Sequence, residues 1–115
     1  SRGYDMNKQQ WIRTLPCAIC GAPPPSECSH VRTAKNSGTG SKPSDEYLIP
    51  ACRKCHHSEH QHGRTRTLET IGKFMTRDDA KYYYLYLSEK YEKKFYDVVV
   101  KEARQAIKKT PSKGG

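Results

Sequence analysis

Two Cys-x-x-Cys pairs constrain this chain more than any other feature. Cys17 and Cys20 form the first pair, and Cys52 and Cys55 form the second. Four thiolates in two close pairs suit tetrahedral zinc, because each pair brings its sulfurs together through one tight turn. The 31 residues between the pairs are more than a simple zinc ribbon has, which predicts that a folded segment lies between the two pairs. A disulfide pair or free thiols are the alternative interpretations.

The cysteine count also bears on the cellular compartment. Cys28 is the fifth cysteine, and an odd number arranged in Cys-x-x-Cys pairs favours metal binding over a secreted disulfide framework. The simplest location is therefore a reducing cytoplasm. Cys28 itself is interpreted as a small buried hydrophobe, with an additional metal ligand as the alternative.

Charge indicates the kind of partner. The chain has 115 residues, the size of one domain, with 21 Lys and Arg against 12 Asp and Glu, a net charge of +9. This excess favours a polyanionic partner, nucleic acid before membrane. No apolar run approaches the roughly 20 residues that a membrane span needs. The first residues also lack the apolar stretch of a signal peptide.

The order of predicted elements is strand, loop, strand and helix, followed by more helices, which is an α+β fold. Gly63 is a natural stop for the first long helix. The predicted elements are a strand at 27–32, a flexible loop at 33–44, a strand at 47–49, a helix from Arg53 to about Gln61 and a short helix at 68–74.

Beyond Thr76, a potential helix cap, apolar residues recur at spacings of three and four. This pattern predicts one apolar stripe on a helix. The stripe consists of Tyr84, Leu87, Tyr91, Phe95 and Val98. A single helix over 77–109 would be roughly 50 Å long, which is too long for the domain we expect. We therefore predict a break near Ser88 or Asp97.

A cluster of histidines follows the second cysteine pair. His56 and His60 are four residues apart, so on a helix they share one face and can bind one metal. His57 and His62 are interpreted as surface residues. His30 lies at the end of the first predicted strand, and the return strand leads directly into the helix that carries His56. A solvated polar helix end is the alternative interpretation of the cluster.

These residues together resemble the HNH endonucleases, whose fold is a small ββα-metal core. The resemblance rests on Cys17-Ala-Ile-Cys20, on Cys-Ser-His30-Val-Arg and on Leu-Ile-Pro-Ala-Cys52-Arg-Lys-Cys55-His56. It covers roughly residues 15–64. The loop Gly-Ser-Lys-Pro-Ser-Asp45 and the run Cys-His-His-Ser-Glu-His60-Gln-His-Gly63 are most similar to phage recombination-enhancement nucleases, which act with the RecA recombinase.

The resemblance implies a role for each histidine. His30 would be the general base, and His56 and His60 would bind a second divalent metal, magnesium or zinc, beside the structural zinc. Two positions depart from the family pattern. Ser29 replaces the Asp or His that often precedes the base, and Tyr47 replaces the middle Asn. Asp45 and Asn36 are possible substitutes, although neither fits by spacing, and His30 itself is a further candidate ligand.

The implied function is hydrolysis of DNA phosphodiesters, with nicks directed by a RecA-type filament, in the cytoplasm of a bacterial host if the chain is phage-encoded. Five cations flank the predicted site and could hold phosphates, although each alone could be a solvated charge. These are Arg32, Lys35, Lys42, Arg64 and Arg66. The expected organisation is an N-terminal extension at 1–14, the HNH core at 15–64, a helical part at 65–110 and a disordered tail at 111–115.

Two non-catalytic functions compete with the nuclease. The chain could be a zinc-stabilised DNA-binding module whose histidines are incidental or bind a second structural zinc. It could instead be a basic adaptor that docks on a protein filament through its Tyr-rich helices, since eight tyrosines are more than one core stripe requires. Ser29 and Tyr47 favour the binding module, because neither supplies the family's metal ligand.

Overall fold

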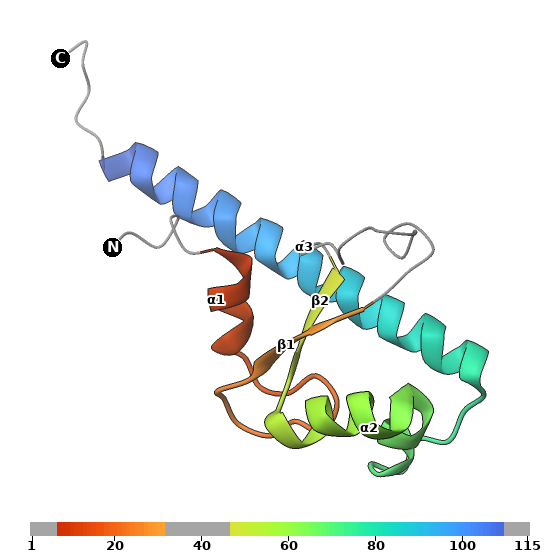
Figure 1. Cartoon of the computed structure of the whole chain (residues 1–115). Helices are drawn as coiled ribbons and strands as arrows, with labels where there is room; N and C mark the ends of the chain where they lie inside the picture. Colours follow the sequence, from red (N-terminus) through yellow and green to blue (C-terminus); the bar gives the residue numbers. More distant parts are fainter. Residues whose placement is uncertain (1–6, 32–46, 110–115) are drawn as a thin grey trace, which may run out of the picture.

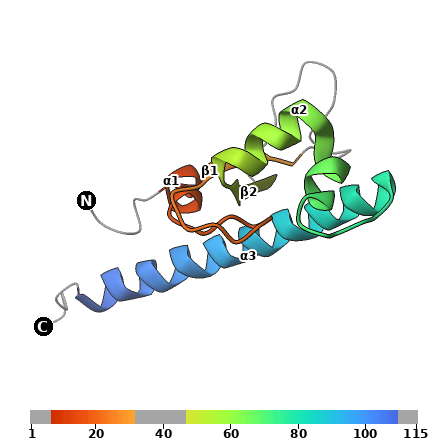
Figure 2. The same ribbon diagram turned by 90° about the horizontal axis from the view of Figure 1, so that it is seen from below.

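A computed structural model describes residues 7–31 and 47–109 of the chain. Its elements are α1 (Lys8–Arg13), β1 (Glu27–His30), β2 (Leu48–Ala51), α2 (Arg53–Glu69) and α3 (Arg77–Lys109). The α1 helix, the hairpin and α2 all lie along one side of α3 (Figures 1 and 2). The fold is therefore α+β, with one small sheet and C-terminal helices, as predicted.

The sheet is an antiparallel pair of short strands. Glu27 lies opposite Ala51 and His30 lies opposite Leu48. A two-stranded sheet is marginally stable alone, but every residue of β2 is buried, because α1, α2 and α3 all contact it. The sheet therefore depends on the helices around it. The predicted strands agree with β1 and β2 to within two residues at each described end.

Two apolar clusters join the hairpin to the helices. In the first, Tyr84 and Leu87 of α3 are buried with Ile49 and Leu68. The second joins two residues of α1 to one residue of β2 and to the next part of the α3 stripe. Its members are Trp11, Ile12, Leu48, Tyr91, Phe95 and Val98. The predicted apolar stripe is thus confirmed, and α1 is an integral part of the core.

The predicted break in α3 is wrong: one helix of 33 residues runs from Arg77 to Lys109. No glycine or proline interrupts this span. Ser88 is buried, but its hydroxyl donates to the Leu85 carbonyl at 2.8 Å, so its polar group is satisfied within the helix. The length is possible because the C-terminal end of α3 projects beyond the other elements (Figure 1).

The α2 helix contains the stop that Gly63 predicted. Gly63 has φ 88° and ψ 171°, which divides α2 into two helical segments, and the ribbon of α2 changes direction along its length (Figure 2). The second segment ends at Glu69, and Gly72 follows with φ 81°. The helix predicted at 68–74 is therefore wrong in position, because the chain becomes helical directly after Gly63 and turns at Gly72.

None of the helices in the described ranges combines the length and the apolar character needed to cross a membrane. The longest, α3, carries charged residues along its whole length. The tail predicted at 111–115 and the whole of the loop predicted at 33–44 lie outside the described residues.

Candidate metal centre and histidine hollow

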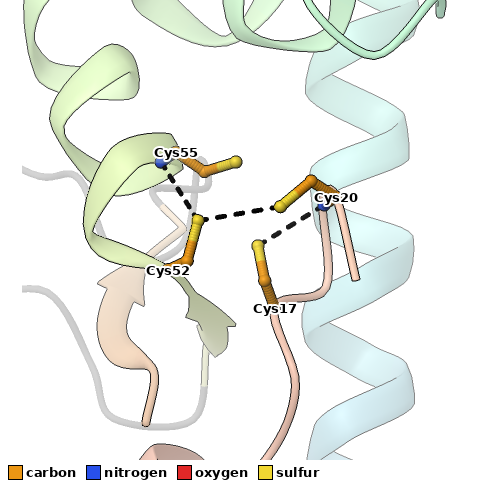
Figure 3. A group of neighbouring side chains, drawn as sticks. All are labelled: Cys17, Cys20, Cys52 and Cys55. Carbon is orange, nitrogen blue, oxygen red and sulfur yellow. Dashed lines mark hydrogen bonds between the residues drawn. The ribbon is translucent and has the colours of Figure 1, made fainter. Parts of the chain in front are cut away.

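The four paired cysteines converge on one point, although more than thirty residues separate the pairs. The Sγ atoms of Cys17, Cys20, Cys52 and Cys55 all lie within 4.8 Å of one another. Figure 3 shows the first pair on the loop before β1 and the second pair at the start of α2. We call this group the cysteine knuckle.

The sulfur spacing fits a tetrahedral metal. In a zinc–thiolate centre with Zn–S bonds of ~2.3 Å, neighbouring sulfurs lie ~3.8 Å apart. The Sγ atoms of Cys20 and Cys52 are 3.7 Å apart. A disulfide would bring two sulfurs to ~2.05 Å, and none of the five cysteines forms one. The four thiols could therefore hold a metal such as zinc.

The two Cys-x-x-Cys turns are built alike. The backbone N–H of Cys20 donates to Cys17 Sγ at 3.4 Å, and that of Cys55 donates to Cys52 Sγ at 3.4 Å. The first turn is also tied to the sheet, because Ala18 N–H donates to the Pro50 carbonyl at 2.8 Å. The same backbone hydrogen bond therefore positions the first sulfur of each pair.

Electrostatics explain why such a cluster needs a cation. Burial raises the pKa of Cys17, but N–H groups of Cys20, Cys52 and Ile19 outweigh it and leave that pKa below its usual value. Burial raises the pKa of Cys20 and of Cys55, and neighbouring sulfurs raise that of Cys55 further. One thiolate is favoured and others are resisted, so four thiolates require a positive ion.

A second group of side chains lies on the first segment of α2. His56 Nε2 and His60 Nε2 face each other at 3.2 Å. Two imidazoles on one tetrahedral metal, with bonds of ~2.05 Å, would place their nitrogens ~3.4 Å apart. The other ring nitrogen of His56, Nδ1, is 2.7 Å from Glu27 Oε1 on β1. A carboxylate in this position orients a metal-binding histidine.

His30 faces the same space as this pair. A hollow of about 420 Å³ is lined by Ser29, His30, His56, Glu59, His60, Gly63 and Arg64. We call it the histidine hollow. His30 and His60 are exposed, and His56 is half-buried. The structure thus brings the three predicted site histidines together. Within the described residues, the cysteine knuckle is the one convergent group of three or more potential metal ligands.

Glu59 lines the histidine hollow and accepts two hydrogen bonds there. Its Oε1 accepts a hydrogen bond from Ser29 at 2.6 Å, and its Oε2 accepts one from Tyr84 at 2.7 Å. Burial and the Glu59 charge raise the pKa of Tyr84, so Tyr84 stays protonated and donates. The Arg64 guanidinium lies 5.0 Å from the centre of the Tyr84 ring. One carboxylate therefore links β1, α2 and α3.

The remaining predicted residues are placed as follows. Tyr47 lines a different hollow beside α3 with Glu89 and Glu92. Arg66 is exposed, and its Nε lies 3.9 Å from Glu69 Oε1. The half-buried Cys28 donates to the Gln9 carbonyl at 3.5 Å and contacts the second apolar cluster, so the small-hydrophobe interpretation holds. Outside the described residues lie Arg32, Lys35, Asn36, Lys42 and Asp45.

Residues 2–72 match the family described as "Protein of unknown function (DUF968)". The chain belongs to the DUF968 family. The match spans α1, the hairpin and α2, and so includes the cysteine knuckle and all three site histidines, whereas α3 lies beyond it.

A curated relative is similar to part of the chain. The DUF968 chain is 40% identical over 50 residues to the uncharacterized protein YdfU of Escherichia coli (strain K12). The aligned part is 44% of this chain but only 14% of YdfU, so the chain spans a small fraction of that relative's length. No solved structure matches the chain.

Sequence reasoning missed two carboxylates of this DUF968 chain. Glu59 follows Cys55 by four residues, so it shares the helix face that turns inward, and that spacing could have identified it. Glu27 begins β1 and lies opposite Ala51, the residue that precedes Cys52 of the knuckle. Only the strand register places it beside His56.

Proposed function

We propose that this DUF968 chain is a metal-dependent DNA endonuclease with an HNH-type ββα-metal core. One observation carries the proposal: a histidine at the end of β1 and a histidine pair on α2 line one hollow beside a four-cysteine knuckle. The order of these residues along the chain is also that of the HNH pattern. The net charge of +9 suits a polyanionic substrate.

The residues divide the chemistry among them. His30 is exposed at the mouth of the hollow, where a neutral imidazole can take a proton from an attacking water near neutral pH. His56 and His60 would hold a divalent cation, with Glu27 orienting His56. Such a cation, when bound, stabilises negative charge on the phosphate and the leaving 3′ oxygen. Two protein ligands leave other positions open for water and phosphate.

The cysteine knuckle would have a structural role. Zinc with four thiolate ligands has no open position for substrate. Its ligands come from the loop before β1 and from the start of α2, so zinc would fix the strand that carries His30 relative to the helix that carries His56. Chemistry and folding would thus use separate metals.

A second candidate is a zinc-stabilised DNA-binding module without catalysis. Ser29 favours it. This side chain precedes the proposed base, where HNH nucleases often have a ligand, but it is buried and donates to Glu59. It therefore contributes to folding and adds no metal ligand. The two candidates differ in a single measurable property, the cleavage of DNA.

A plasmid-nicking assay separates them. The zinc-loaded protein is incubated with supercoiled DNA and added magnesium, manganese or zinc. We expect His30→Ala to slow nicking by ~10²–10⁴-fold, the usual contribution of a general base. His57→Ala is the control for the loss of an imidazole, because His57 is exposed on α2 and does not line the histidine hollow. Wild-type nicking by His30→Ala would contradict the proposal and favour the binding module.

We also propose a RecA-type filament as the targeting partner, on the resemblance to recombination-enhancement nucleases. Electrostatic binding to phosphates carries no sequence information, so a useful nuclease needs direction from elsewhere. A displacement loop with and without the filament is added to the same assay. Equal cutting in both would remove this partner while leaving the nuclease proposal intact.

A further inference from the structure

A second hollow continues from the histidine hollow. It has a volume of about 720 Å³ and lies between the second segment of α2 and the first turns of α3. Its lining includes Gly63 and Arg64 from α2, and Arg77, Asp78 and Lys81 from α3. We call it the basic hollow. The proposed chemistry does not use it.

Positive charge dominates this lining. Arg64, Arg77 and Lys81 contribute three positive charges and Asp78 one negative charge, so the lining carries a net charge of +2. Arg77 and Lys81 are four residues apart, and thus share one face of α3. Asp78 has a separate role, because an acidic residue in the first helical turn stabilises the helix dipole. The two α3 cations are exposed and available to an anion.

Two residues join the basic hollow to the histidine hollow. Gly63 and Arg64 line both. At Gly63 the backbone adopts φ 88° and ψ 171°, a conformation open essentially to glycine alone, and beyond the adjoining residues and helix backbone no heavy atom lies within 4 Å of where a Cβ would be. The two hollows therefore adjoin at Gly63 and Arg64. A linear polyanion could occupy both.

We propose that the basic hollow binds the DNA backbone next to the phosphate that enters the histidine hollow, with Arg77 and Lys81 each neutralising one phosphate. A chain of evenly spaced phosphates is a ligand that matches the positive charge of the lining and that can occupy two adjoining hollows at once. The position of the neighbouring phosphate relative to cleavage rests on the proposed nuclease function. The phosphate site itself rests on the basic lining alone.

The test measures binding separately from cleavage. The parent is the His30→Ala protein, which keeps DNA intact if the nuclease proposal holds. Duplex DNA carrying a fluorophore is titrated by anisotropy over a range of KCl concentrations. The variant is Arg77→Gln/Lys81→Gln. The matched control is Lys101→Gln/Lys108→Gln, which removes two exposed charges from the far end of the same helix. Circular dichroism and zinc content check that all three proteins fold.

The salt dependence reports the number of phosphates contacted. Each neutralised phosphate contributes about 0.9 to the slope of log affinity against log salt. Removing Arg77 and Lys81 should therefore reduce the slope by about 1.8, equivalent to about 60-fold in affinity at 0.1 M salt relative to 1 M. The control should keep the parent slope within about 0.5.

Each outcome decides something. A selective loss in Arg77→Gln/Lys81→Gln supports the site, even if the wild type proves unable to nick plasmid. Equal losses in the variant and the control would overturn the site, because net charge alone would then explain binding. A variant that binds like the parent would overturn it too. A parent that does not bind DNA at all would overturn both the site and the nuclease.

Discussion

The cysteine knuckle and the histidine hollow are adjacent, yet they are built differently. The knuckle draws four equivalent sulfurs from two distant segments and surrounds one point with them. The hollow draws two imidazoles from neighbouring turns of one helix and a third from a strand, and leaves two of the three exposed. A saturated ligand set is suited to holding a fold together, whereas an incomplete set leaves room for a substrate.

The largest expected effect would come from Cys52→Ser, at the N-terminal cap of α2, compared with His60→Ala within α2. Cys52→Ser removes one of four knuckle ligands, and zinc–thiolate binding contributes roughly 10 kcal/mol or more to a fold of this kind. We expect zinc loss and an unfolded chain. His60→Ala, on the same helix, should keep one zinc and full helicity. Elemental analysis and circular dichroism provide the two measurements.

The same two variants test whether the two regions have separate roles. A folded, metal-free Cys52→Ser protein would mean that the apolar core alone holds the hairpin. Unfolding of His60→Ala would mean that the histidine pair is structural as well. Either result would remove the division of roles between the two regions.

A smaller effect is expected at the bend between the two segments of α2. Gly63→Ala forces a side chain into φ 88° and ψ 171°, which costs about 1–3 kcal/mol. Asn tolerates the ordinary left-handed region but not this one, so Gly63→Asn should fare no better. Urea denaturation gives the free energy of unfolding. Full stability in either variant would show that the bend relaxes freely and does not define the hollow.

The smallest expected effect concerns the hydrogen bond between Tyr84 and Glu59, which lines the histidine hollow. Tyr84→Phe removes the hydroxyl that donates to Glu59 Oε2 at 2.7 Å, and should cost about 1–2 kcal/mol at neutral pH. Tyr86→Phe is the control, because Tyr86 is 58% exposed on the same helix and should change stability little. Thermal or urea unfolding of the two variants distinguishes them.

The same substitution carries a pH signature. Burial and the Glu59 charge raise the pKa of Tyr84 above the ~10 of an unfolded tyrosine. The stabilisation is therefore complete below pH ~10 and is lost as pH rises above it, by up to about 1.4 kcal/mol per pH unit. Wild type should lose stability above pH ~10 more steeply than Tyr84→Phe. Parallel pH curves would contradict this assignment.

The local elements were predictable because their signals are local. Gly63 marked the end of the first α2 segment, and the spacing of Tyr84, Leu87 and Tyr91 marked the buried face of α3. The length of α3 was not predictable from the size of the domain, because the helix continues past the core that a size argument assumes. Its uninterrupted run of residues without glycine or proline was the better guide.

The site was predictable only in part, for a related reason. Spacing alone identified Cys17, Cys20, Cys52 and Cys55 as one group, and the structure brings them together. The role of Glu59 depends on contacts with Ser29 on β1 and Tyr84 on α3. The spacing of residues within one segment cannot predict contacts that join three separate segments. The catalytic assignment of His30 stays a prediction until cleavage is measured.

The hydrogen bond from Val31 N–H to the Tyr47 carbonyl, 2.7 Å long, has a consequence for recognising distant relatives. It joins the two residues that flank residues 32–46 in the sequence. Doubling the length of a closed loop costs only about 0.6 kcal/mol, so insertions or deletions there would leave the knuckle geometry unchanged. The fold therefore tolerates a change in the interval between the cysteine pairs. A search that requires a fixed interval would overlook relatives, whereas one anchored on the residues around each pair would find them.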